Sequence, residues 1–157
     1  MEQQIKLKKI YGDVFFTATR KQDNAYIYAR WFGVQSVETV KEGGYKLLEM
    51  IMEKPCRMLL NSNKNVVGSW DMALEWAEVE WAPQMRSAGL RYLAQVVPSS
   101  IFASLTIDSL VLRIGDEFEI RTFEEEADAE AWLKSVGAQK PKYGFFRSAD
   151  GDIGSPQ

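Results

Sequence analysis

The chain has 157 residues, which fits one domain with a substantial core. Its formal net charge of -3 disfavours a nucleic-acid-binding protein, because DNA and RNA attract chains with a basic excess. It has no histidine, and this removes Ser-His and Cys-His nucleophilic sites, histidine bases and the commonest zinc ligand. We therefore expect a non-catalytic protein that holds no metal or cofactor.

A single cysteine, Cys56, excludes an intramolecular disulfide and a multi-cysteine metal site. The first residues lack the apolar run of a signal peptide, and no window reaches about 18 uninterrupted apolar residues. We expect a cytoplasmic protein with no transmembrane segment.

The chain begins with two short strands, Ile5 to Tyr11 and Val14 to Thr19, joined by a tight turn at Gly12-Asp13. The next strand, Ala25 to Phe32, is apolar on both faces, which predicts an interior position in the sheet.

A helix follows, with Ser36 as its N-cap and apolar residues at spacings of three and four up to Ile51. Gly43-Gly44 at its centre costs about 1 kcal/mol per glycine relative to alanine. We therefore expect another group to approach that backbone closely. Pro55 ends this helix, and Cys56 to Leu60 is a short buried strand.

The stretch from Met58 to Val97 alternates buried strand, polar loop, helix and buried strand, which is typical of a parallel α/β sheet. The loop runs from Asn61 to Gly68, and we expect the helix to open at Ser69. One stripe of this helix packs on the sheet. A second apolar stripe lies on the far side and consists of Met72, Trp76, Val79 and Pro83.

The remaining elements continue the alternation. Pro83 should kink or interrupt the tryptophan-rich helix, and Gly89 should cap it. After the strand Leu90 to Val97, Pro98-Ser99-Ser100 opens a helical stretch to about Leu112, and Glu117 to Arg121 is a final strand. Thr122 and Glu125 have the spacing of a capping box for a last helix, which Gly137 ends.

Residues 1–136 are thus predicted to form the α/β domain, and residues 137–157 a flexible tail. The tail is rich in Gly, Ser, Asp and Pro but contains Tyr143, Phe145 and Phe146. These aromatic residues either dock, on the domain or on a second copy, or stay disordered.

Three segments carry a family resemblance: MLLNSNKNVVGSW (Met58 to Trp70), EWAPQMRSAGLRYLAQVV (Glu80 to Val97) and FEIRTFEEEADAEAWL (Phe118 to Leu133). With the order of elements, they resemble the STAS domain of anti-sigma-factor antagonists and the related CRAL-TRIO-like lipid-binding fold, and are closest to small bacterial STAS-like proteins. The resemblance covers residues 5 to 136. It implies a single mixed, mostly parallel sheet with an N-terminal hairpin, covered by about four helices, and a non-catalytic regulatory role.

In the STAS antagonists, a serine before the second helix is phosphorylated by the partner kinase, typically after an aspartate. Ser69 falls near that position, but it follows Gly68. Free N-H groups at the helix start, with Lys64, would also suit a small anion. The alternative is that the asparagines only satisfy a turn and Ser69 is an ordinary N-cap. The candidate anion or phosphate site, in a crevice between neighbouring loops, consists of Asn61, Ser62, Asn63, Lys64, Ser69 and Ser99.

The outer stripe of Met72, Trp76, Val79 and Pro83 is a candidate surface for a protein partner or a homodimer, unless the 99–112 segment or the tail covers it. The alternative function is a carrier of a lipid or small apolar ligand, suggested by the CRAL-TRIO resemblance and Gly43-Gly44. A plain core would also account for those residues. A carrier needs a closed apolar cavity, whereas a signalling module needs a filled core and an exposed helix.

Overall fold

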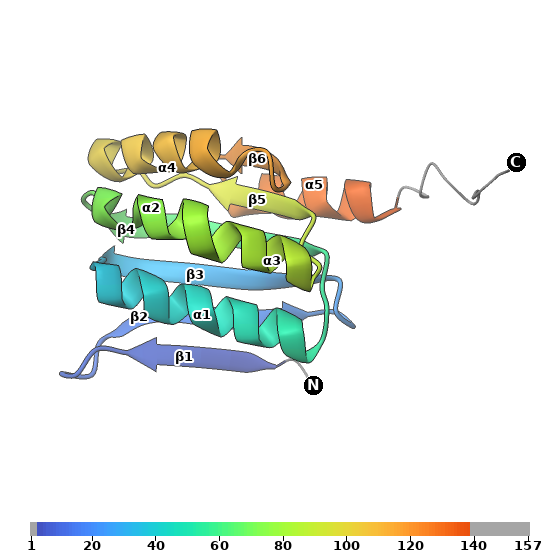
Figure 1. The fold of residues 1–157 in the computed structure, drawn as a ribbon, viewed down its shortest axis with the longest axis horizontal. Coiled ribbons are helices and arrows are strands. Elements are labelled where there is room, and N and C mark those ends of the chain that lie inside the picture. The colour runs from blue at the N-terminus through green and yellow to red at the C-terminus, as the bar shows by residue number, and fades with distance from the viewer. Residues whose placement is uncertain (1–2, 139–157) are drawn as a thin grey trace, which may run out of the picture.

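Six strands form one sheet in the order of the chain, β1-β2-β3-β4-β5-β6, in a computed structural model that describes residues 3–138 (Figure 1). The pairs β1-β2 and β2-β3 are antiparallel, and the other three neighbouring pairs are parallel. The predicted fold class, a mixed and mostly parallel sheet with an N-terminal hairpin, is confirmed. The strands are β1 (Gln4–Lys8), β2 (Val14–Lys21), β3 (Tyr26–Val34), β4 (Met58–Val67), β5 (Tyr92–Val96) and β6 (Glu119–Phe123).

Helices cover both faces of the sheet, with three helical units on one face and one on the other. The first layer holds α1 (Val37–Glu53), a continuous run from Asp71 to Ala88, and α4 (Ile101–Ile114), and α5 (Glu126–Ala138) lies behind the sheet (Figure 1). Right-handed crossovers between strands added in one direction place their helices on the same face, which explains this layer. The run, called the 71–88 helix below, comprises η1 (Asp71–Ala73), α2 (Leu74–Trp76), η2 (Ala77–Trp81) and α3 (Ala82–Ala88).

The core has two parts, one on each side of the sheet. The larger part lies under the helix layer, and the strand β3 contributes Ile27 and Trp31 to it. The smaller part lies under α5 and includes Tyr26 and Leu60. The interior position predicted for the third strand is thus confirmed, since β3 pairs with β2 and β4 and buries side chains on both faces.

The helix α1 begins as predicted, with Ser36 and Thr39 forming a reciprocal capping box. Its two central glycines make room for tryptophan rings. A Cβ at Gly43 would lie 2.3 Å from the Trp31 ring, and a Cβ at Gly44 would lie 2.6 Å from the Trp76 ring. The expected close approach to Gly43-Gly44 is therefore confirmed, and the approaching groups are core side chains.

The prediction of a loop from Asn61 to Gly68 is wrong, because β4 continues to Val67. Polar partners in the core satisfy its asparagines, so a polar sequence is stable there as a strand. Ser69 does not open the helix either. The first helical turn begins at Asp71, and Ser69 Oγ only accepts a hydrogen bond from the Asp71 N-H.

The predicted position of Trp76 on the outer face of the helix is also wrong. Only 8% of Trp76 is exposed, and its ring faces α1 rather than solvent. A π-helical turn, η2, causes this arrangement. Trp76 and Trp81 have the i, i+5 spacing of π-helical hydrogen bonds, and both indoles contact Gly44. Pro83 does not interrupt the run, which continues to Ala88, and it lies in the first turn of α3 directly after η2. Gly89 ends the helix, as predicted, with a φ of +127°.

The last helix differs from its prediction at both ends. Thr122 lies in β6 and α5 starts at Glu126, so the Thr122-Glu125 capping box is wrong. Gly137 lies within α5 and does not end it. The predicted tail beyond Ala138, with Tyr143, Phe145 and Phe146, lies outside the described residues. No helix among residues 3–138 is both long and apolar enough to cross a membrane.

Candidate functional site

The strands β4 and β5 are parallel neighbours, as the predicted crevice requires, with Ser62 opposite Val96. Because successive side chains of a strand point to opposite faces, however, β4 divides the candidate residues between the two sides of the sheet. Asn61 and Asn63 lie beneath the helix layer, whereas Ser62 and Lys64 contact residues that begin α5. The structure therefore does not bring these four residues to one site.

Beneath the helix layer, side-chain amides form a ladder across three strands. The Trp31 indole N-H donates to Asn61 Oδ1 at 2.8 Å, and Asn61 Nδ2 donates to Gln95 Oε1 at 3.1 Å. Gln95 Nε2 donates in turn to Asn63 Oδ1 at 2.8 Å. All four residues are buried. Asn61 and Asn63 thus hold the core together and are not open to a solute.

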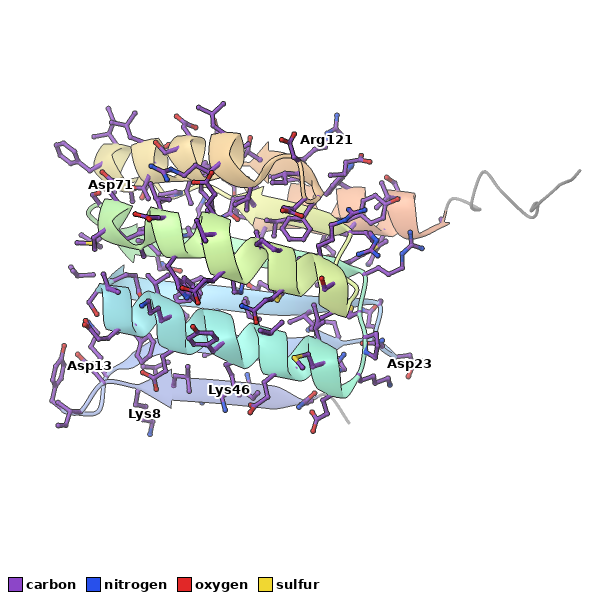
Figure 2. All side chains as sticks on the ribbon, viewed as in Figure 1. Lys8, Asp13, Asp23, Lys46, Asp71 and Arg121 are labelled. Atoms are coloured by element: carbon purple, nitrogen blue, oxygen red, sulfur yellow. The ribbon has the colours of Figure 1, made fainter. Side chains whose placement is uncertain are left out.

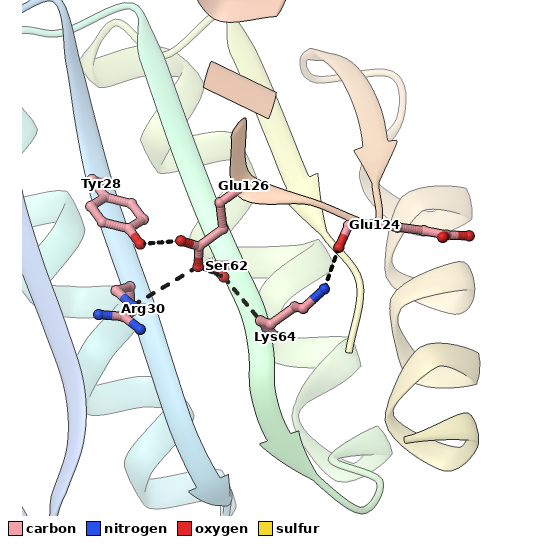
Figure 3. Close-up of polar contacts among 6 residues, drawn as sticks. All are labelled: Tyr28, Arg30, Ser62, Lys64, Glu124 and Glu126. Carbon is pink, nitrogen blue, oxygen red and sulfur yellow. Dashed lines mark hydrogen bonds and ion pairs between the residues drawn. The ribbon is translucent and has the colours of Figure 1, made fainter. Parts of the chain in front are cut away.

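On the opposite face, the carboxylate of Glu126 contacts three side chains from β3 and β4 (Figure 3). Ser62 Oγ donates to its Oε2 at 2.6 Å, and the Tyr28 hydroxyl donates to its Oε1. Arg30 Nε lies 3.9 Å from Oε2. A carboxylate in the first turn also complements the positive end of the α5 dipole. This cluster fastens the start of α5 to the sheet.

Lys64 lies beside this cluster rather than near Ser69. Its Nζ donates to the Glu124 carbonyl at 2.7 Å and to the Glu125 carboxylate at 3.2 Å (Figure 3 draws the first of these contacts). Sequence reasoning singled out Ser62 and Lys64 but missed Tyr28, Arg30 and Glu126. The alternation along the third strand already placed Tyr28 on this face. Glu126 lies 98 residues after Tyr28 in the sequence, and no local sequence pattern predicts that these two side chains meet.

The pKa of the Tyr28 hydroxyl is raised above its ordinary value, chiefly by burial and secondly by its hydrogen bond to Glu126. Tyr28 therefore remains a protonated donor to the carboxylate at neutral pH.

Ser69 is exposed just beyond the end of β4, and Asp71 is the carboxylate beside it. Its Oγ lies 3.2 Å from Thr106 Oγ1, and the same Thr106 hydroxyl donates to Asp71 Oδ1 at 2.7 Å. Figure 2 shows Asp71 at the beginning of the 71–88 helix. Ser99 is exposed in the segment between β5 and α4. The structure thus brings Ser69 together with Asp71 and Thr106.

A small cavity in the core bears on the carrier alternative. It has a volume of about 40 Å³, between Trp31, Asn61, Trp76, Trp81 and Leu110. A water molecule occupies about 30 Å³ in the liquid, so the cavity accommodates about one water. A lipid-like ligand does not fit there.

Larger hollows lie on the surface, in a groove between α1 and the 71–88 helix. One hollow of about 270 Å³ is bordered by Val37 and Lys41 on one side and by Met72 and Val79 on the other. A second, of about 360 Å³, lies further along the same two helices between Met52 and Pro83. The Tyr45 and Trp76 rings meet edge-on between them, 5.1 Å apart. We call this feature the helix groove.

The helix groove contains the exposed part of the predicted outer stripe. Met72 and Val79 are each 63% exposed, and Pro83 is partly buried. The 99–112 segment does not cover them, because α4 contacts the 71–88 helix on its other side, through Arg113 and Glu78. On α1, Met52 is 69% exposed. The groove therefore presents large apolar side chains from both of its walls.

A further apolar surface is the outward side of α4, where Leu112 is 86% exposed, with Ile101, Phe102 and Leu105 also exposed. None of the hollows described in this section is lined by these four side chains.

A larger hollow, of about 520 Å³, lies at the amino-terminal ends of β3 and β4 and is lined partly by Cys56 and Leu133. Cys56 itself is buried, and burial raises the pKa of its thiol. The thiol is therefore a poor nucleophile.

Comparison of the chain with known proteins found no matching family model and no matching curated protein. Within the described residues, no cluster of three or more His, Cys, Asp or Glu side chains is placed to hold a metal ion.

Proposed function

We propose that the chain is a non-catalytic protein-interaction module of the STAS-like kind, and that it binds a protein partner in the helix groove. The observation that carries this proposal is the exposure of Met52, Met72 and Val79, each at least 63%, on the walls of two hollows that lie along the same pair of helices. Methionine adapts to differently shaped partners and is enriched at binding surfaces. Exposed apolar side chains that line a groove are characteristic of an interaction site.

The carrier function has less support. A carrier of a lipid or small apolar ligand would need an enclosed space of several hundred Å³. The core instead holds a cavity of about 40 Å³, and the glycine pair accommodates Trp31 and Trp76. The open hollows of the helix groove suit a polypeptide better than an enclosed small molecule.

Site-specific photo-crosslinking tests the proposal. A benzoylphenylalanine residue replaces Val79 in the full chain, expressed in the cells that encode it, and a matched variant carries the same residue in place of Leu112. Both positions are exposed and apolar, but only Val79 lines the helix groove. We expect discrete adducts with a second polypeptide from position 79 and none from position 112. Absence of adducts from position 79, or equal adducts from both positions, would reject the groove as the binding surface.

The mass of the adduct also distinguishes the kind of partner. Twice the mass of the chain would indicate a homodimer through the groove, and any other mass a different protein.

A further inference from the structure

We infer that the partner of the helix groove is an amphipathic helix that carries lysine or arginine beside its apolar stripe. The inference rests on the proposed function and specifies the chemistry of its partner. The observations are the shape of the groove and the charges on its rims.

The shape of the helix groove fits a helix. Two roughly parallel helices form its walls, and its two hollows follow each other along them (Figure 1). The α1 wall has 17 residues and is therefore about 25 Å long, which matches a partner helix of four to five turns. Met72 and Val79 border one hollow and Met52 the other, so a partner with apolar residues about one or two turns apart can contact both.

The rims of the helix groove are acidic. Helical periodicity places Glu38 on α1 next to the side that carries Lys41, Tyr45 and Met52. On the other wall, Glu75 and Glu80 line the groove itself and are exposed. The exposed rim glutamates are thus Glu38, Glu75 and Glu80, whereas Glu53 accepts a hydrogen bond from Gln3 and Glu49 pairs with Lys46 on the side of α1 that faces β1.

Few cations offset these carboxylates. Lys46 forms an ion pair with Glu49 at 2.9 Å and lies on the side of α1 toward β1, away from the groove (Figure 2). Lys41 is the lysine at the groove wall. The basic side chains of the 71–88 helix and α4 point away from the groove: Arg86 donates to the Glu117 carbonyl and Arg113 pairs with Glu78. The groove therefore combines an apolar floor with a net negative rim.

Charge complementarity selects the occupant. A helix flanked by Lys or Arg places its cations next to the rim glutamates while its apolar side chains enter the hollows. A second copy of this chain, docked groove to groove, would bring two acidic rims together, and like charges at an interface are costly. An acidic helix is disfavoured for the same reason.

Three synthetic peptides of 18 residues test the inference with the full chain. The first places leucine on one face of a helix and lysine elsewhere; the second has glutamate in place of lysine; the third has the composition of the first with leucine spread around the helix. Fluorescence anisotropy of the labelled peptides at about 0.1 M salt measures binding without strong screening at contact distance. We expect the Leu-Lys peptide to bind at least about tenfold more tightly than either other peptide.

Variants of the chain locate the binding. Glu75→Lys combined with Glu80→Lys should weaken the Leu-Lys peptide about tenfold or more, since two rim attractions become repulsions. The matched control, Glu119→Lys with Asp128→Lys, changes the net charge equally on β6 and α5 and should alter binding less than about threefold. Met72→Ser with Val79→Ser should also weaken binding, whereas Leu112→Ser should not. Urea unfolding of each variant verifies that it folds.

Several results would overturn the inference. One is equal binding of the Leu-Glu and Leu-Lys peptides, and another is an equal loss from the control charge reversal, which would mean unspecific attraction. Failure of the Leu-Lys peptide to bind would also overturn it. In each of these cases an adduct from position 79 would leave the proposed function standing. If the Leu-Lys peptide binds but position 79 gives no adduct, the proposed function is rejected, while the preference of the groove for a basic amphipathic helix stands.

Discussion

Gly44 and Trp76 are in such close contact that a methyl group at the glycine would lie 2.6 Å from Cη2 of the indole. The Trp81 ring meets the same glycine, and its indole N-H donates to the Gly44 carbonyl at 3.0 Å. One residue without a side chain therefore determines how closely α1 packs against the 71–88 helix. The spacing of these two helices sets the width of the helix groove.

Replacement of this glycine should destabilise the protein. Gly44→Ala gains about 1 kcal/mol of helix propensity, but it overpacks a contact between two tryptophans, which costs about 1–3 kcal/mol. We expect a net loss and a lower urea midpoint. Gly137→Ala is the control, because its Cβ would meet the flexible Met58 thioether at 3.1 Å, and its midpoint should change little. A higher midpoint for Gly44→Ala would show that the rings move aside freely.

The amide ladder should respond strongly to loss of its central member. Gln95→Leu leaves Asn61 Nδ2 and Asn63 Oδ1 buried without these partners, and each such group costs about 1–3 kcal/mol. We expect a loss of about 2–4 kcal/mol in the free energy of unfolding, measured by urea denaturation. Gln84→Leu, on the exposed surface of α3, is the control and should change stability by less than about 0.5 kcal/mol. Similar losses for both variants would contradict a structural role for the ladder.

Tyr28 should make stability fall at high pH. Its pKa is raised in the folded protein above the ordinary value of 10.0, so the folded state binds the proton more tightly than the unfolded chain does. This contribution is complete below pH 10 and is lost as the pH rises further, because the unfolded tyrosine then ionises while the folded one does not.

The measurement compares the wild-type chain with Tyr28→Phe in urea at pH 9 and pH 11. At pH 9, loss of a hydrogen bond to a charged group should cost about 1.5–3 kcal/mol. The difference between the two proteins should shrink at pH 11. Phe123→Leu is the control, since it disturbs a ring contact with Trp132 but removes no ionisable group, and its difference should be the same at the two pH values. An unchanged difference for Tyr28→Phe would contradict the raised pKa.

Cys56 should react only when the protein opens. Burial raises its thiol pKa, which lowers the fraction of reactive thiolate and also blocks access. With a disulfide reagent at pH 8, we expect the reaction of the native chain to be at least about a hundredfold slower than that of the urea-unfolded chain. Rapid labelling of the native chain would mean that Cys56 is accessible from the adjoining hollow.

The sequence predicted the fold well where its signals are local. Apolar faces on the third strand, the Ser36 cap and the alternation of strands with amphipathic helices all depend on near neighbours, and the structure agrees with them. The neighbouring position of β4 and β5 also followed from this alternation.

The candidate site was harder to predict because its residues depend on distant partners. Asn61 and Asn63 look like loop residues until Gln95 supplies buried hydrogen bonds from 34 and 32 residues away. A π turn in the 71–88 helix moved Trp76 from the outer face that regular helical spacing assigned to it. The sequence predicted only one wall of the helix groove, the stripe that contains Met72 and Val79. It did not indicate that α1, with Met52, forms the other wall.

The strand order suggests how the molecule can assemble during translation. Each new strand pairs with the one synthesised just before it, so no strand has to insert between two that are already joined. The nascent sheet can therefore widen at its growing edge as the polypeptide leaves the ribosome. Among the elements of residues 3–138, α5 is the one that must reach back across this width, where Glu126 and Glu130 meet Tyr28 and Tyr26 over separations of 98 and 104 residues. Docking of α5 is thus the natural last step of folding, and until then the tyrosine face of the sheet is open to chaperones.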